Sequence, residues 1–103
     1  MAGLSDHTVI DRLLHEPARA VISAILYAVE SADFLYLQRE TGLTKGNLSA
    51  HLARLEEAGY VEIEKTYRGK IPLTLCRLTE KGRKAFENYR SQLKQFVEAV
   101  ENR

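Results

Sequence analysis

A leucine stripe at helical spacing constrains the fold of this chain most strongly. It consists of Leu48, Leu52 and Leu55, which fall at i, i+4 and i+7 and therefore lie along one side of a helix. The other side carries small, polar or basic residues, and no acidic residue occurs between Glu40 and Glu56. We expect a helix with an apolar back in a packed core and a front that can enter the major groove of DNA.

A second helix is expected directly before this stripe. Residues 37–43 read Leu-Gln-Arg-Glu-Thr-Gly-Leu, which is typical of a helix that ends in a turn containing glycine. Two helices joined in this way form a helix-turn-helix, and the second of them is the recognition helix. We therefore predict a recognition helix over about residues 44–58.

The front of this helix supplies the first set of candidate DNA contacts. Asn pairs with adenine and Arg with guanine through two hydrogen bonds each, whereas Ser and Lys mainly position the backbone. Gly46 and Ala50 allow close approach, and His51, which borders the apolar stripe, either reaches a phosphate or packs half-buried. The predicted contacts are Thr44, Lys45, Gly46, Asn47, Ser49, Ala50, His51 and Arg54.

A basic-tipped hairpin is predicted next. Gly59 is placed for a left-handed helix end, and residues 60–67 then alternate as a strand does. Val61, Ile63, Lys65 and Tyr67 face one way, and Glu62, Glu64 and Thr66 face the other. The returning strand covers residues 72–78, with its proline near the start. We expect a wing over about residues 65–72, whose tip, Arg68, Gly69 and Lys70, contacts the DNA backbone or minor groove.

The remaining segments are predicted from caps and periodicity. Ser5 or Asp6 is expected to cap a short helix carrying Val9, Ile10, Leu13 and Leu14, and Pro17 to open the next helix. The inward face of that next helix is expected to be Ala18, Ile22, Ile25, Leu26 and Val29. Phe34 and Leu35 are predicted to form a very short strand, and Thr79 is predicted to cap a final helix.

The final helix carries an apolar seam. Phe86, Tyr89, Leu93, Phe96 and Val100 recur at spacings of 3, 4, 3 and 4. The seam serves either the core of one chain or a second subunit, and its apolar area favours a second subunit because a small domain rarely leaves so much exposed. The residues predicted at a dimer interface are Ile10, Leu13, Leu14, Tyr89, Leu93, Phe96, Val97 and Val100.

The fold class follows from this order of elements. A chain of 103 residues with 45% hydrophobic residues builds one packed domain. We predict an α+β fold, mostly helical: a winged helix-turn-helix with a two-stranded wing and a C-terminal dimerisation helix. Residues 17–83 form its core, and residues 1–16 and 84–103 are dimerisation elements. The net charge is −3 over residues 1–43 and +4 over residues 44–103, so the basic excess begins at the recognition helix.

Three blocks of sequence resemble the MarR-like winged-helix transcriptional regulators, especially their small stand-alone members. They are Leu-Thr-Lys-Gly-Asn-Leu-Ser-Ala-His-Leu at 43–52, Leu-Glu-Glu-Ala-Gly-Tyr-Val at 55–61 and Leu-Thr-Glu-Lys-Gly-Arg at 78–83. The resemblance implies a recognition helix, its exit into the wing and the junction to the last helix, in that order. One difference is that MarR wings carry an Asp two residues before the wing Arg, where this chain has Thr66.

Other classes of function lack their motifs. The chain has no phosphate-binding glycine loop, no nucleophile elbow and no HExxH, so we expect no enzyme and no cofactor. His7, His15 and His51 lack metal-ligand spacing, and the one cysteine, Cys76, excludes the paired thiols by which the related ArsR regulators bind metal. Cys76 is expected to be a small buried strand residue, with a redox switch as the alternative.

The expected partners are double-stranded DNA and a second copy of the chain. No apolar run approaches the roughly 18 residues of a membrane span, and Met1 to Ile10 show no secretory signal, so we expect a cytoplasmic protein. Whether a small-molecule effector binds is left open. The alternative function is a winged-helix protein-interaction module without DNA binding, which the acid-free recognition face disfavours.

Overall fold

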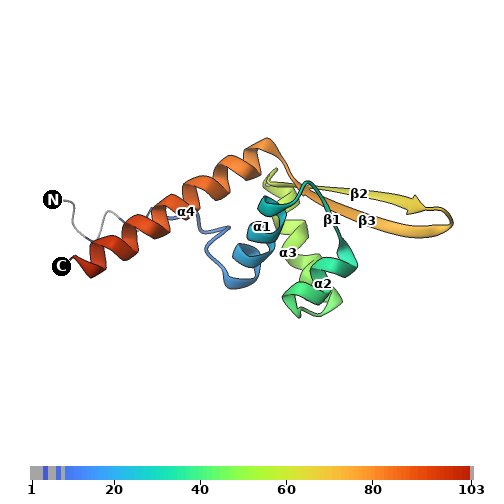
Figure 1. Ribbon diagram of the computed structural model, residues 1–103, viewed down its shortest axis with the longest axis horizontal. Helices are drawn as coiled ribbons and strands as arrows, with labels where there is room; N and C mark the ends of the chain where they lie inside the picture. Colours follow the sequence, from blue (N-terminus) through green and yellow to red (C-terminus); the bar gives the residue numbers. More distant parts are fainter. Residues whose placement is uncertain (1–3, 5–6, 8, 103) are drawn as a thin grey trace.

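The computed structural model describes residues 4, 7 and 9–102, and it has four helices and three strands within that part of the chain. In chain order they are α1 (Pro17–Ala28), β1 (Ala32–Asp33), α2 (Phe34–Thr41), α3 (Lys45–Glu57), β2 (Val61–Arg68), β3 (Ile71–Leu78) and α4 (Glu80–Glu101). The β2–β3 hairpin projects from one end of the molecule and the distal half of α4 from the other, with α1, α2 and α3 between them (Figure 1). The predicted α+β, mostly helical winged helix-turn-helix is confirmed.

The helix starts follow their capping residues. Pro17 opens α1, as predicted, and the Thr79 hydroxyl caps α4 by accepting a hydrogen bond from the Gly82 N–H at 3.0 Å. The Thr44 hydroxyl caps α3 in the same way, accepting from the Asn47 N–H at 3.1 Å. Gly59 adopts φ +80° just after α3, so the predicted left-handed helix end is also confirmed.

Two local predictions are wrong. The short strand is Ala32–Asp33, two residues earlier than predicted, because the Asp33 carboxylate accepts the Tyr36 N–H at 2.8 Å and thereby starts α2 at Phe34. Residues 9–14 are not helical: residues 12–14 form a turn, in which one oxygen of the Asp11 carboxylate accepts the N–H groups of Leu13 and Leu14. The predicted caps of that helix, residues 5 and 6, lie outside the described residues.

The three strands form one antiparallel sheet in the order β1-β3-β2, so the wing hairpin gains a third strand at its base. β1 pairs with β3 through Ala32 and Cys76. Pro72, near the start of β3, lies beyond the end of β1, so its missing N–H interrupts no hydrogen bond between these two strands. Gly69 and Lys70 form a two-residue turn between the paired Arg68 and Ile71. Gly69 has φ +64°, the sign that a type II′ hairpin turn requires at this position.

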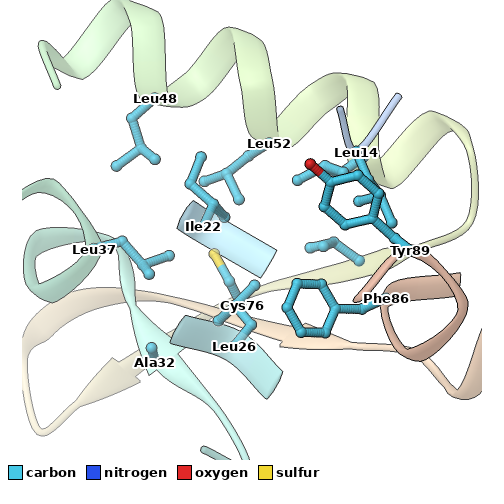
Figure 2. Close-up of a cluster of buried hydrophobic side chains, with 12 residues drawn as sticks. Leu14, Ile22, Leu26, Ala32, Leu37, Leu48, Leu52, Cys76, Phe86 and Tyr89 are labelled. Carbon is cyan, nitrogen blue, oxygen red and sulfur yellow. The ribbon is translucent and has the colours of Figure 1, made fainter. Parts of the chain in front are cut away.

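The core lies where α1, α3 and the sheet meet. Leu48, Leu52 and Leu55 are buried, as the stripe predicted, and Figure 2 shows Leu48 and Leu52 pointing toward Ile22 of α1 and Cys76 of β3. Truncating any one of these leucines to alanine should cost about 2–5 kcal/mol of folding free energy. The back of the recognition helix is therefore held rigidly against α1 and the sheet.

Candidate nucleic-acid interface

The front of α3 is fully available to a ligand. Thr44, Lys45, Gly46, Asn47, Ser49, Ala50 and Arg54 are all exposed, on the side of the helix away from the buried leucines. No carboxylate lies among them, because the first acidic residue of α3 is Glu56 in its last turn. This face therefore presents small and donor side chains without the negative charge that would repel phosphates.

His51 differs from the other predicted contacts because it is half-buried. Its Nδ1 lies 3.1 Å from the guanidinium NH1 of Arg19, on α1, and 3.7 Å from a carboxylate oxygen of Glu16. The hydrogen bond from the Arg19 N–H holds the pKa of the Glu16 carboxyl below its ordinary value, so this carboxylate is ionised at neutral pH. The ring is thus packed against α1, as one of the two sequence interpretations proposed.

The wing tip is an exposed cationic turn. Arg68, Gly69 and Lys70 are exposed, and so are Tyr67 and Ile71 beside them. Residues 68–70 form the end of a hairpin that projects well beyond the helices (Figure 1). A turn of this shape can approach a phosphate backbone closely, because Gly69 has no side chain in the way.

A groove of about 500 Å³ lies between α3, the start of α2 and the wing, and the carboxylates of Asp33 and Glu56 are among its lining side chains. Lys45 and Ser49 line its helix side, and Lys65 and Thr74, which pair across the hairpin, line its wing side. Lys65 was not among the predicted contacts. The strand alternation placed it on the same face as Val61, but only the packing of the sheet on α3 reveals that this face borders the recognition helix.

The residues predicted at a dimer interface divide into two groups. Leu14 and Tyr89 are buried within one chain, and Figure 2 shows them beside each other, while Ile10, Leu13 and Leu93 are partly buried against the same core. Along the distal half of α4, the exposed fractions of Phe96, Val97 and Val100 are 38%, 49% and 48%. Phe96 also lies against the His7 ring, with 5.8 Å between the ring centroids. Of the predicted interface residues, this second group alone is exposed enough to contact a second subunit without rearranging the core.

Cys76 lies in the core, and burial raises the pKa of its thiol to about 11. We expect the native protein to resist a thiol-specific reagent at neutral pH and to react fully once denatured, because attack requires the thiolate and an opening of the core. Release of the reagent's chromophore, followed with and without denaturant, measures this. Immediate stoichiometric labelling of the native protein would favour the redox-switch alternative instead.

Two further findings concern the described residues as a whole. Among residues 4, 7 and 9–102, no group of three or more His, Cys, Asp or Glu side chains is arranged to hold a metal ion. Within the same residues, no helix combines the length and apolar character that crossing a bilayer requires.

A helix-turn-helix whose recognition helix exposes a face free of acidic residues before Glu56, together with a cationic wing, is the architecture of a winged-helix DNA-binding protein. The chain matches the model of the winged helix DNA-binding domain over residues 18–97, and it belongs to this family. It is 38% identical over 91 residues to an uncharacterized protein of Methanocaldococcus jannaschii, covering 87% of this chain and 98% of that protein.

Solved structures agree with this assignment. The structure of a transcriptional regulator homologue from Pyrococcus horikoshii OT3 superposes with a TM-score of 0.85 at 28% identity, covering 94% of this chain and 95% of that one. A MarR-family regulator from Enterococcus faecalis V583 shares the fold, with a TM-score of 0.72 at 18% identity over 99% of this chain and 91% of that one. The predicted resemblance to MarR-like winged-helix regulators is confirmed at the level of the fold.

Proposed function

We propose that this protein is a sequence-specific transcriptional regulator that binds DNA as a homodimer. The observation that carries the proposal is the exposed front of α3, which has donors and small residues but no carboxylate before Glu56. Its rigid backing by buried leucines suits a helix that must keep its place in a groove. Winged helices that serve as protein-interaction modules often carry acidic or large apolar groups on this face, and this one carries neither.

In this proposal α3 enters the major groove, and the wing lies on the backbone or in the adjacent minor groove. Asn47 and Arg54 read base edges, because their side chains suit two-bond contacts with adenine and guanine. One DNA strand then passes through the groove between α3 and the wing. Lys45 and Lys65, which line the two sides of that groove, contact its phosphates.

Salt dependence tests the proposal directly. We expect binding to a duplex from the DNA upstream of the protein's own gene, with log affinity falling by about 0.9 per phosphate contact for each unit of log salt. The double variant Arg68→Ala, Lys70→Ala should weaken specific and random duplexes alike and reduce that slope by nearly two per subunit. Fluorescence anisotropy over a salt series measures both. No binding to any duplex at low salt would reject the function and favour the interaction module.

Asn47→Ala separates base reading from backbone contact. If Asn47 pairs with adenine, its loss should cost about 1–3 kcal/mol per half-site and relax the preference at one base position in each half-site. Thr44, whose hydroxyl caps the helix, remains in place, so α3 itself should be unchanged. Affinities for a set of single-base site variants measure this preference. An equal loss on every sequence would reassign Asn47 to the backbone.

The dimer places two recognition helices on one face of the DNA. The distal half of α4 supplies its contact surface through Phe96, Val97 and Val100, which no other described part of the chain covers fully. Two-fold symmetry then makes the preferred site a near-palindrome, with half-sites one helical turn, about 34 Å, apart.

A further inference from the structure

Arg19, on the first turn of α1, is a cation that the DNA-binding surface does not use directly. Its side chain is only 13% exposed. Its Nε donates a hydrogen bond of 2.6 Å to the Leu13 carbonyl, which fixes the guanidinium, and its NH1 lies 3.1 Å from Nδ1 of His51 on α3. A guanidinium held in this way is poorly placed to reach a phosphate itself.

The Arg19 contact determines where His51 carries its proton. A guanidinium can only donate hydrogen bonds, so Nδ1 must be the acceptor and must lack a hydrogen. The Glu16 carboxylate lies 3.7 Å from Nδ1, which is too far for a hydrogen bond to the ring. The same carboxylate lies 3.9 Å from the Arg19 guanidinium and balances its charge. The neutral ring therefore carries its proton on Nε2.

The ring retains access to solvent on the recognition helix. The side chain of His51 is 22% exposed, although its Nδ1 is occupied by Arg19. Its neighbours along the helix, Asn47 and Arg54, are exposed on the predicted DNA face. With its proton on Nε2, the ring can donate a hydrogen bond from that atom. In the other neutral tautomer Nε2 has no proton and can only accept.

We propose that Arg19 is a positioning residue for DNA binding: it locks His51 in the neutral tautomer with the proton on Nε2, and Nε2 donates that proton in a hydrogen bond to a DNA phosphate. The proposal rests on the proposed function. It adds a residue of α1, outside the helix-turn-helix and the wing, to the machinery that determines affinity. It also assigns His51 one role that combines both sequence interpretations, half-buried packing at Nδ1 and a phosphate contact at Nε2.

The tautomer is tested on the free protein, without DNA. Nitrogen-15 spectra of the histidine rings at mildly alkaline pH distinguish a protonated from a bare ring nitrogen, and loss of signals in His51→Gln assigns them. We expect His51 to have a bare Nδ1 and a protonated Nε2, and Arg19→Met to give a mixture of tautomers. A proton on Nδ1 in the unmutated protein would overturn the proposal, whether or not the protein binds DNA. If Arg19→Met does not fold, the spectrum of the unmutated protein by itself still tests which ring nitrogen of His51 carries the proton.

The link to DNA is tested by a double-variant cycle on the binding affinity. Arg19→Met and His51→Ala should each weaken binding about fivefold per half-site, the effect of one ordinary hydrogen bond in each subunit. The double variant should be no weaker than His51→Ala alone, because Arg19 acts only through the ring. Arg19→Lys, which keeps a cationic donor, should retain most of the affinity. Thermal unfolding of each variant checks that the fold is intact.

The salt slope separates this role from its alternatives. A neutral ring releases no counterion, so Arg19→Met should leave the slope of log affinity against log salt unchanged. A slope lowered by about 0.9 per subunit would mean that Arg19 contacts a phosphate itself, and additive losses in the cycle would mean a general structural effect. Either result overturns the positioning role. Absence of DNA binding by the unmutated protein would instead reject the proposed function and leave the tautomer result standing.

Discussion

Replacing both Phe96 and Val100 by glutamate is expected to give a folded monomer that binds its DNA site about 100-fold more weakly. The two side chains are 38% and 48% exposed on the distal half of α4, beyond the part of the helix that packs on the core. Because each side chain is already more than half buried in one chain, its burial in a dimer contributes about 1 kcal/mol, and carboxylates there would have to be desolvated. Because the two recognition helices then bind separately, the gain from linking two half-sites is lost.

Light scattering and anisotropy at matched protein concentrations measure the two effects. Val21→Glu is a matched control, because Val21 is exposed to the same extent as Val100 but lies on α1, away from this surface. It should leave both the dimer and the affinity intact. A monomeric unmutated protein at micromolar concentration would contradict the proposed assembly, and so would a double variant that remains dimeric.

Gly82→Ala is expected to destabilise the fold by about 3 kcal/mol or more. A Cβ at Gly82, in the first turn of α4, would overlap the backbone carbonyl of Tyr60 and lie within 2.9 Å of its Cα. That carbonyl already accepts the Thr79 N–H, and the Thr79 hydroxyl bonds to the Gly59 carbonyl. The junction joins the end of α3 to the start of α4, so neither backbone can move without breaking these hydrogen bonds.

Chemical denaturation followed by circular dichroism measures the loss. Gly46→Ala is the matched control, because Gly46 is also helical but a Cβ there would meet nothing within 4 Å. It should leave stability unchanged or raise it by up to about 1 kcal/mol, the difference in helix propensity. Equal stabilities for the two variants would mean that the junction adapts more easily than its packing indicates.

The elements that the sequence predicted well are those whose signals are local. The stripe of Leu48, Leu52 and Leu55 defines which side of α3 is buried, and it requires no knowledge of what covers it. The hydroxyl of Thr79 and the glycine at 59 mark helix ends through bonds or dihedral angles within a few residues. The exposed DNA-binding face follows from the same periodicity, because it is the side that the leucines do not use.

The errors near the N-terminus arose because a competing local bond was missed. Both Asp33 and Asp11 use a carboxylate oxygen on nearby backbone N–H groups, which starts α2 early in one case and forms a turn in the other. The second oxygen of Asp11 accepts the Tyr60 hydroxyl at 2.7 Å, a partner 49 residues away that holds this turn against the end of α3. Periodicity in residues 9–14 carries no trace of that partner.

By itself, the sequence determined the helix-turn-helix, the wing and the chemistry of the surface they present, because each depends on residues close together in the chain. Only the tertiary structure decided how the ambiguous side chains are used. Burial of Leu14 and Tyr89 in one chain leaves Phe96, Val97 and Val100, on the distal half of α4, as the exposed members of the predicted dimer interface. Packing of α1 against α3 brings Arg19 to His51, and packing of the sheet brings Lys65 to the edge of the recognition helix. These pairs lie far apart in sequence, so no spacing or pattern along the chain encodes their contact.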